Sequence, residues 1–270
     1  MVKGVAQTEL SGKRSSRMVA LLAILDERGE TQLSDLAKAL NASEATIRRD
    51  VAVLSERRLL ERTHGGARPM TGLSELPVSL RDGRNRSAKQ RIASEAAACI
   101  PPGRHAMALT GGTTATEVLK SLQHRDDLTI ITNSITIALE AADQGQSRVL
   151  IAGGVLRANS MELVGPLTEN TFKQVNVATA IVGTDGISAA GGVTTHDFTE
   201  AQTNHTMIKG AHRVIVVADS SKVGVVTLAK LADIDEVDLL ITDSGADAEA
   251  LEAIRRSGVT VKVVQLGDDR

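Results

Sequence analysis

Apolar residues recur with a helical period three times within the first sixty residues. The first helix is predicted to start at a cap on Ser15 or Ser16 and to end at Gly29. The second helix is predicted over residues 33–40, and the third after an N-cap at Ser43. The predicted buried faces carry Met18, Leu21, Leu22, Leu25, Leu33, Leu36, Ala37, Leu40, Ile47, Val51 and Leu54. Two short helices joined by a tight turn, the second one capped, are typical of a helix-turn-helix.

The pattern changes to short extended segments after the third helix. Residues 59–62 are expected to form a strand, Gly65-Gly66 a tight turn and Arg68-Pro69 the exit, which together make a two-stranded wing. Residues 71–86 contain glycine and proline with little periodicity, as linkers do. The sequence therefore predicts a winged helix-turn-helix domain over residues 14–69, a linker over 70–86 and a second domain over 87–270.

Beyond residue 103 short apolar runs alternate with helical patterns. Strands are predicted at 105–109, 128–132, 149–152, 177–182, 214–218, 237–242 and 259–264, and helices at 113–122, 134–143, 167–172, 200–210 and 247–256; a charged helix also begins near Ser87. Continuous apolar strands alternating with helices indicate a mostly parallel sheet covered on both faces. The predicted fold class is α/β, with a Rossmann-like sheet in the second domain.

Composition narrows the possible functions. The 270 residues include two Phe, no Trp and no Tyr, so stacking platforms for single-stranded nucleic acid are nearly excluded. The single cysteine, Cys99, cannot form an internal disulfide, and we expect no metal site. Because no run of about eighteen apolar residues occurs, we expect no membrane association and a cytoplasmic protein. The net charge of the chain is −2, but residues 1–70 are net positive, with twelve Lys/Arg and nine Asp/Glu.

Two adjacent arginines, Arg48 and Arg49, lie early in the third helix. Because Ile47 and its helical neighbours take the buried face, Arg48, Arg49 and Thr46 should point away from it, where a recognition helix meets a DNA duplex. The alternative is that the arginines pair with nearby acids on a solvated surface. With the helix-turn-helix and the wing beside them, we predict binding to double-stranded operator DNA through Ser43, Thr46, Arg48, Arg49, Arg62 and His64.

The stretch ALTGGTTATEVLKSL joins a predicted strand to a predicted helix. Gly111, Gly112, Thr113 and Thr114 would place backbone N–H groups, hydroxyls and the positive end of a helix at one point, which suits a phosphate group. An ordinary strand-to-helix turn is an equally good interpretation of this motif alone. Since a Walker lysine and dinucleotide spacing are missing, nucleoside triphosphates and NAD are poor candidates.

Other predicted strands end in polar residues at what should be the same edge of the sheet. Asn133, Asp185 and Lys222 follow three of these strands, and Glu200 opens a predicted helix. Ligands of open parallel sheets bind outside the carboxyl ends of the strands, so Lys222 is a candidate phosphate contact and the two acids are candidates for sugar hydroxyls. For each residue taken singly, a capping or turn role is an equal alternative.

Two separated motifs of the first domain, Thr46-Ile47-Arg48-Arg49-Asp50 and His64-Gly65-Gly66-Ala67, resemble the DeoR family of bacterial transcriptional regulators. One departure is Arg58, which stands where the family usually has glycine at the end of the recognition helix; a left-handed conformation there would cost up to about 1 kcal/mol.

The second domain resembles the sensor domain of the same family, which is similar to ribose-5-phosphate isomerase and glucosamine-6-phosphate deaminase. The motifs that carry this resemblance are GGTT, TNS, AGGVLR, GTDGIS, EA and DSSK, and they add Arg157 to the candidate effector contacts. The resemblance implies a repressor of a carbohydrate-catabolism operon, controlled by a phosphorylated sugar, and we expect no cofactor. We also expect a homo-oligomer, because a single winged module makes few contacts and repeated half-sites multiply them.

A sugar-phosphate isomerase or deaminase with an appended DNA-binding domain is the alternative function. Isomerases of this fold carry an Asp-Gly-Ala-Asp pattern, whereas the similar place here reads Val182-Gly183-Thr184-Asp185. Moving a proton between adjacent carbons needs a positioned base and a group that stabilises the enediolate. Because one acid of the pair is missing, we expect a ligand sensor with no catalytic residues.

Overall fold

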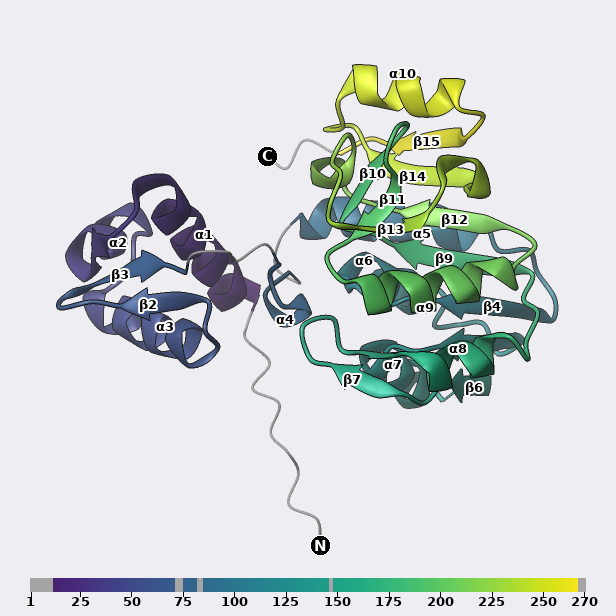
Figure 1. Ribbon diagram of the computed structural model, residues 1–270, viewed down its shortest axis with the longest axis horizontal. Helices are drawn as coiled ribbons and strands as arrows, with labels where there is room; N and C mark the ends of the chain where they lie inside the picture. The colour runs from purple at the N-terminus through teal and green to yellow at the C-terminus, as the bar shows by residue number, and fades with distance from the viewer. Residues whose placement is uncertain (1–11, 71–74, 82–84, 146–147, 267–270) are drawn as a thin grey trace, which may run out of the picture. The chain divides into compact units, whose positions relative to one another are not determined.

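The computed structural model describes residues 12–70, 75–81, 85–145 and 148–266. The chain divides into two compact units, Met1–Arg84 and Asn85–Arg270, which are described separately (Figure 1).

The first unit is a winged helix-turn-helix, as the sequence predicts. Its helices are α1 (Gly12–Arg28), α2 (Leu33–Ala39) and α3 (Glu44–Glu56), and the wing consists of β2 (Leu60–Arg62) and β3 (Gly66–Pro69). A short strand that was not predicted, β1 (Thr31–Gln32), pairs with β3 to complete a three-stranded antiparallel sheet. Buried side chains from the three helices and the wing form one core, among them Met18, Leu21, Leu36, Ile47, Val51, Leu54, Leu60 and Ala67.

The start of α1 corrects the predicted cap. The helix begins at Gly12, so Ser15 and Ser16 lie inside it and do not cap it. Ser15 is buried because it shares a helix face with Met18 and Leu22, three and seven residues further on.

A short helix, α4 (Val78–Arg81), lies within the segment predicted as a linker. Its Leu80 is fully buried in the core of the first unit, and Arg81 forms an ion pair of 2.8 Å with Glu75. Part of residues 70–86 is therefore packed structure that the sparse periodicity did not reveal.

The second unit is built on a seven-stranded sheet with the order β15-β14-β12-β9-β4-β5-β6. All neighbouring strands are parallel. The strands are β4 (His105–Leu109), β5 (Leu128–Thr132), β6 (Arg148–Ile151), β9 (Thr179–Gly183), β12 (Val214–Val217), β14 (Leu239–Asp243) and β15 (Thr260–Val264). All seven correspond to predicted strands, so the expected parallel sheet is confirmed.

Helices cover both faces of the sheet (Figure 1). One core packs α5 (Arg86–Ala98), α6 (Thr113–Ser121) and α7 (Ile135–Gln144) against one face. The other core holds α8 (Pro166–Phe172), α9 (Phe198–Lys209) and α10 (Ala248–Arg256) on the opposite face. Alternate residues of β9 enter the two cores, Ala180 and Val182 the second and Ile181 the first, as expected for a strand buried on both sides.

Two small antiparallel sheets that were not predicted are separate from this sheet, one of three strands and one of two. β7 (Val155–Arg157) pairs with β8 (Glu162–Val164). β10 (Gly186–Ser188) pairs with β11 (Gly192–Thr195), which in turn pairs with β13 (Ala229–Ala232). Within the described ranges of the chain, no helix is both long and apolar enough to cross a membrane.

Candidate nucleic-acid interface and ligand site

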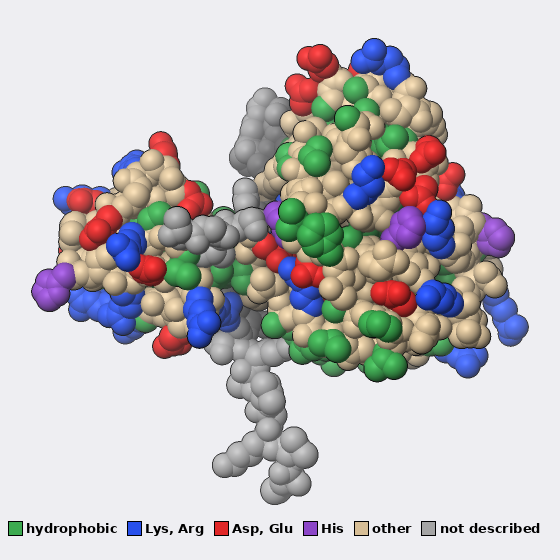
Figure 2. Space-filling view, viewed as in Figure 1, with side chains coloured by type: hydrophobic (Ala, Val, Ile, Leu, Met, Phe, Trp, Pro, Cys, Tyr) green, Lys and Arg blue, Asp and Glu red, His purple; other side chains and the backbone are tan. Residues whose placement is uncertain are grey.

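Helix α3 presents its arginines on the side opposite to its buried face. Ser43 caps the helix, since its Oγ accepts a hydrogen bond of 3.2 Å from the Thr46 backbone N–H. Ile47 is fully buried, whereas Arg48 and Arg49 are exposed. Figure 2 shows Lys and Arg side chains gathered along the side of the first unit where α3 and the wing lie. This is the charge distribution that a duplex backbone requires.

The acid of the Thr-Ile-Arg-Arg-Asp motif is already paired elsewhere. The Asp50 carboxylate is buried on α3 and binds Arg14 Nε at 3.1 Å and Arg17 Nε at 2.7 Å, both on α1. Among the described residues, neither Arg48 nor Arg49 has a side-chain ion pair. The interpretation in which the two arginines pair with Asp50 is therefore not what the structure shows.

The wing carries further exposed polar side chains. Arg62 lies on β2 and His64 at the turn, and both are exposed. Gly65 has a φ of +87°, and a Cβ on Gly66 would lie 2.4 Å from the Thr31 carbonyl oxygen, so both glycines are required by the close turn. Arg68 donates to Glu61 across the wing at 2.6 Å, which neutralises its charge locally.

Arg58, at the end of α3, has a φ of +57°. Arg58 therefore adopts the left-handed conformation that the sequence analysis considered for it. Unlike the glycine usual in the family, it has a Cβ, which makes this conformation unfavourable.

In the second unit, the motif Gly111–Thr114 forms the start of α6. Gly112 is the N-cap residue with a φ of +104°, Thr114 is buried and Thr113 half-buried. The positive end of the helix dipole lies at this point. One amide is occupied, however, because the Gly111 N–H donates to Glu162 Oε1 on β8 at 2.5 Å.

Carboxylates and a hydroxyl lie beside this helix start. Thr195 Oγ1, at the end of β11, donates to Glu200 Oε1 at 2.6 Å and lies 3.2 Å from Asp185 Oδ2. Lys222 Nζ, in the turn after β12, lies 3.8 Å from Asp185 Oδ1. Asp185, Glu200 and Lys222, which the sequence proposed separately, are thus connected in one cluster.

Arg157 joins the same cluster from β7. Its Nη1 donates to Glu200 Oε2 at 2.9 Å, and its Nε lies 3.4 Å from Asp197 Oδ2. Asp197 also caps α9, because its Oδ1 accepts from the Glu200 N–H at 2.9 Å. The ribbon β7-β8 and helix α9 are therefore linked by charge at the site.

Asn133 has a supporting position. It is fully buried, and its Nδ2 donates to the Leu163 carbonyl and to Asn204 Oδ1, each at 3.1 Å. Asn204 Nδ2 lies 3.4 Å from Glu162 Oε1. Asn133 thus braces the residues around Glu162, and a direct contact with a ligand stays a prediction.

Asp219 lies next to Lys222 at the end of β12. It accepts from Ser221 Oγ at 2.5 Å and from Asn85 Nδ2 at 2.9 Å. Burial would raise the pKa of Asp219, but the hydrogen bonds from Ser221 and Asn85 and the charges of Lys89 and Lys222 outweigh it and lower that pKa. Asp219 is therefore an ionised, fixed partner for the cations of the site.

Sequence reasoning missed several members of this cluster, chiefly Glu162, Thr195 and Asn204. Glu162 lies in the short strand β8 and Asn204 within α9, so neither follows a predicted strand end. Asp219 was the exception, because it begins the DSSK motif and its position after a strand was visible.

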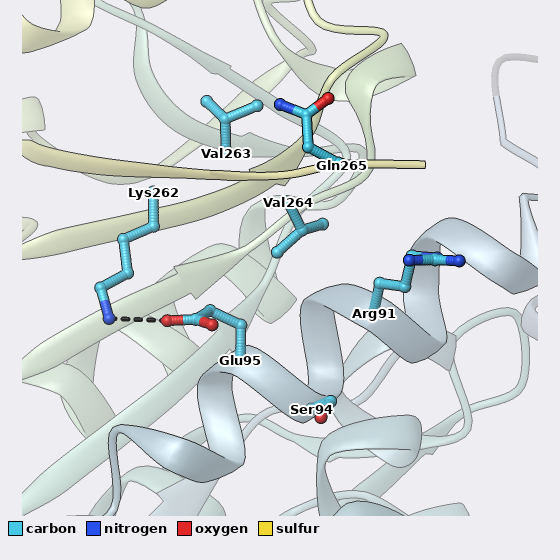
Figure 3. A pocket seen from close by; sticks show the side chains of 7 residues that line it. All are labelled: Arg91, Ser94, Glu95, Lys262, Val263, Val264 and Gln265. Carbon is cyan, nitrogen blue, oxygen red and sulfur yellow. Dashed lines mark hydrogen bonds and ion pairs between the residues drawn. The ribbon is translucent and has the colours of Figure 1, made fainter. Parts of the chain in front are cut away.

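An open pocket of about 490 Å³ lies elsewhere in the unit, between α5 and β15 (Figure 3). It is lined by Arg91, Ser94, Glu95, Lys262, Val263, Val264 and Gln265. Lys262 forms an ion pair of 2.6 Å with Glu95, and three strands separate β15 from β4, the strand that leads into α6. Because its lysine is neutralised and no helix begins there, the chemistry favours the start of α6 as the ligand site.

A winged helix-turn-helix with exposed arginines, joined in one chain to an α/β unit whose polar groups gather at a helix start, is typical of one class of protein: the ligand-responsive transcriptional regulators. Two family models match the chain. The DeoR-like helix-turn-helix domain matches residues 17–71, and the DeoR C terminal sensor domain matches residues 84–244. The chain belongs to the DeoR family and is a DNA-binding transcriptional regulator.

Individual proteins of known sequence are similar to this chain over nearly its whole length. The chain is 35% identical over 253 residues to the HTH-type transcriptional regulator GlpR of Haloferax volcanii, covering 93% of this chain and 97% of that protein. It is 28% identical over 242 residues to the glycerol-3-phosphate regulon repressor of Escherichia coli, covering 90% and 96%. Among solved structures, ribose 5-phosphate isomerase A of Methanocaldococcus jannaschii matches with a TM-score of 0.39 at 16% identity, covering 53% of this chain and 55% of that chain.

Proposed function

We propose that this regulator is a repressor of a carbohydrate-catabolism operon and that a phosphorylated sugar controls its affinity for the operator. The observation that carries the proposal is the cluster at the start of α6, where a helix N-terminus, Lys222, Arg157 and three acids meet. A ligand with an anionic end and a hydroxylated chain matches this combination. The name of the Escherichia coli relative, a glycerol-3-phosphate regulon repressor, supports a phosphorylated effector.

In the DNA-binding half, residues 14–69, Arg48 and Arg49 would contact bases and phosphates in the major groove. Thr46 and Ser43 lie at the start of the same helix and would contact the backbone. Arg62 and His64 would contact phosphates from the wing. Residues 70–86 would connect this half to the sensor, residues 87–270.

In the sensor, the phosphate would bind at Gly111, Gly112, Thr113 and Thr114, with Lys222 as a second contact. Asp185 and Glu200 would accept hydrogen bonds from sugar hydroxyls. Arg157 would fix the orientation of Glu200, which it already binds, and Asn133 would brace the site from beneath.

We propose that the sensor binds without turnover. Val182, which stands where isomerases carry the first acid of their pattern, has an apolar side chain that is fully buried in the core and cannot act as an acid or base. A coupled assay for isomerisation of ribose 5-phosphate is expected to give no turnover. Turnover that is lost in Asp185→Asn would instead establish an enzyme.

Ligand binding can change operator affinity only if the DNA-competent and DNA-incompetent arrangements bind the ligand differently. We also propose a homo-oligomer, because one winged module makes few contacts and repeated half-sites multiply them.

Thermal unfolding of the full chain with ribose 5-phosphate, fructose 1-phosphate, glucosamine 6-phosphate and glycerol 3-phosphate tests the effector. A ligand at about a hundred times its Kd stabilises by roughly 2.7 kcal/mol, and the unphosphorylated sugars serve as controls. A shift with the unphosphorylated sugars alone would contradict the phosphate site.

Gel-shift titration with promoter fragments tests the DNA half. Arg48→Ala and Arg49→Ala are expected to cost about 1–3 kcal/mol of operator binding each. Arg256→Ala, an exposed arginine of the sensor, is the matched control and should leave binding unchanged. Equal affinity of all three variants and the unchanged chain would exclude the assigned interface.

A further inference from the structure

Glu162 is a buried acid that lies against the proposed phosphate site. Its side chain is 2% exposed, and its Oε1 accepts from the Gly111 N–H at 2.5 Å and lies 3.4 Å from Asn204 Nδ2. A Cβ on Gly111 would lie 2.7 Å from Glu162 Cγ, so the glycine permits this close approach. The acid therefore occupies one amide of the helix start at which we place the phosphate.

Glu162 and Glu200 differ in the partners that their carboxyl groups contact. Glu200 holds the favourable partners, the Thr195 hydroxyl at 2.6 Å and the Arg157 guanidinium at 2.9 Å. Glu162 is bound by neutral donors. The elements packed against β8 are β7, α8 and α9, and their charged or titratable groups are Arg157, Glu169, Glu200, His205 and Lys209. His205 and Lys209 contact Glu236, and Asp185, Asp197 and Lys222 belong to the cluster around Glu200. Of the two glutamates, Glu162 is the one that forms no ion pair with a Lys or Arg in the described part of the chain.

Burial raises the pKa of Glu162 well above its ordinary value, and the negative charge of Glu200 raises it further. The hydrogen bonds from Gly111 and Asn204 oppose this effect without cancelling it. Burial among neutral donors, with the negative charge of Glu200 nearby, favours the neutral form of Glu162.

We propose that Glu162 is a charge-selecting residue of the effector site: as a neutral carboxyl group bound to the Gly111 N–H, it allows a dianionic phosphate to bind at the start of α6. An ionised carboxylate at Gly111 would repel the dianion and compete for the same positive helix end. The inference rests on the proposed effector site and adds the group that determines which charge the site accepts.

The protonation state can be measured without any ligand. Infrared difference spectra of the full chain minus Glu162→Gln at pH 7 are expected to show the C=O band of a neutral carboxylic acid. Glu252→Gln, at an exposed acid of α10 that is 59% accessible, is the control and should show only loss of a carboxylate band. A carboxylate band for Glu162 would overturn the proposal.

Sulfate is the probe for charge selection, because it is a dianion across the whole pH range used, unlike phosphate. Calorimetric titration at pH 7 is expected to give the same sulfate affinity for the unchanged chain and for Glu162→Gln within about twofold, since a neutral amide replaces a neutral acid. Binding about tenfold tighter to Glu162→Gln would show that an ionised Glu162 repels the anion, which overturns the inference but leaves the effector site intact.

The two failures are distinguishable. If neither protein binds sulfate or any of the four phosphate esters, the phosphate site at α6 is wrong, and the proposed function and this inference fail together. Because Gln has the shape of Glu and can make the same hydrogen bonds, we expect the variant to fold. Should it unfold, the same infrared band can be followed in the unchanged chain from pH 5 to 9, where a spectrum with no neutral acid at pH 7 overturns the proposal.

Discussion

Asp50 Oδ2, on the recognition helix α3, accepts a hydrogen bond of 2.7 Å from Arg17 Nε on α1. The same carboxylate also binds Arg14. In the run Arg48-Arg49-Asp50, the acid therefore faces inward and fixes α3 to α1, while the two arginines face outward. The motif combines one structural acid with two exposed arginines.

Asp50→Asn should destabilise the first unit by about 1–3 kcal/mol, because two guanidinium groups lose a buried anionic partner. Differential scanning calorimetry of the full chain would measure the effect. Asp35→Asn is the matched control: Asp35 pairs with Lys38 at 3.8 Å on an exposed helix face, so its loss should cost no more than about 0.5 kcal/mol. Equal effects of the two changes would mean that Asp50 does not fix α3.

Arg58→Gly should stabilise the first unit by a few tenths to about 1 kcal/mol, because glycine adopts the left-handed conformation without the Cβ penalty. Arg57→Gly is the control one residue earlier. Arg57 has a φ of −84° and donates to Ser79 Oγ at 3.1 Å, so glycine there should destabilise. Urea unfolding curves would give both values, and a loss of stability in Arg58→Gly would refute the strain.

Gly66→Ala should disrupt the wing, because the added Cβ would lie 2.4 Å from the Thr31 backbone oxygen, where neither partner can move freely. We expect a loss of at least about 1–3 kcal/mol in stability and weaker operator binding in gel-shift titrations. Gly153→Ala, which meets no atom within 4 Å, should change neither. Operator binding by Gly66→Ala at full strength would show that the wing does not contribute.

Glu162 should make the stability of the sensor depend on pH. Its pKa is raised in the folded chain, so its contribution to stability is complete below the ordinary glutamate pKa and is lost as the pH rises through the folded value. Glu162→Gln does not titrate, and its stability should therefore fall less between pH 6 and 9, by at most about 1.4 kcal/mol per pH unit for one proton. Parallel curves for the two proteins in thermal unfolding at successive pH values would contradict the neutral acid.

The parallel sheet could be predicted from sequence because its strands are buried on both faces. Runs such as Val214–Val217 are apolar throughout, and that signal needs no tertiary information. The ribbons β10-β11 and β7-β8 escaped prediction because each strand has only three or four residues. β10 and β11 also contain glycine and polar residues; β11 is Gly192–Thr195, with the sequence GVTT. Their burial depends on neighbours distant in sequence, so no local period marks them.

The residues of the candidate site likewise include some that the sequence predicted and some that it missed. Asp185 and Lys222 follow sheet strands, and the sequence could therefore place them at one edge. Glu162 could not be found, because a single glutamate in a short strand gives no sign that a distant amide, Gly111 N–H, will bind it. The start of α1 was also predicted wrongly. Serine is a common N-cap residue, but Ser15 lies inside the helix and faces the core.

Asn85, the first residue of the sensor unit, has a φ of +51° and donates through its side chain to Asp219. The charge of Asp219 is balanced by Lys89 and Lys222. An anion that draws Lys222 away would leave Asp219 more dependent on Asn85 and Lys89. The first residue of the sensor unit is thus attached by its side chain to the turn that carries Lys222, so a rearrangement of that turn would alter a contact at the point where the unit begins.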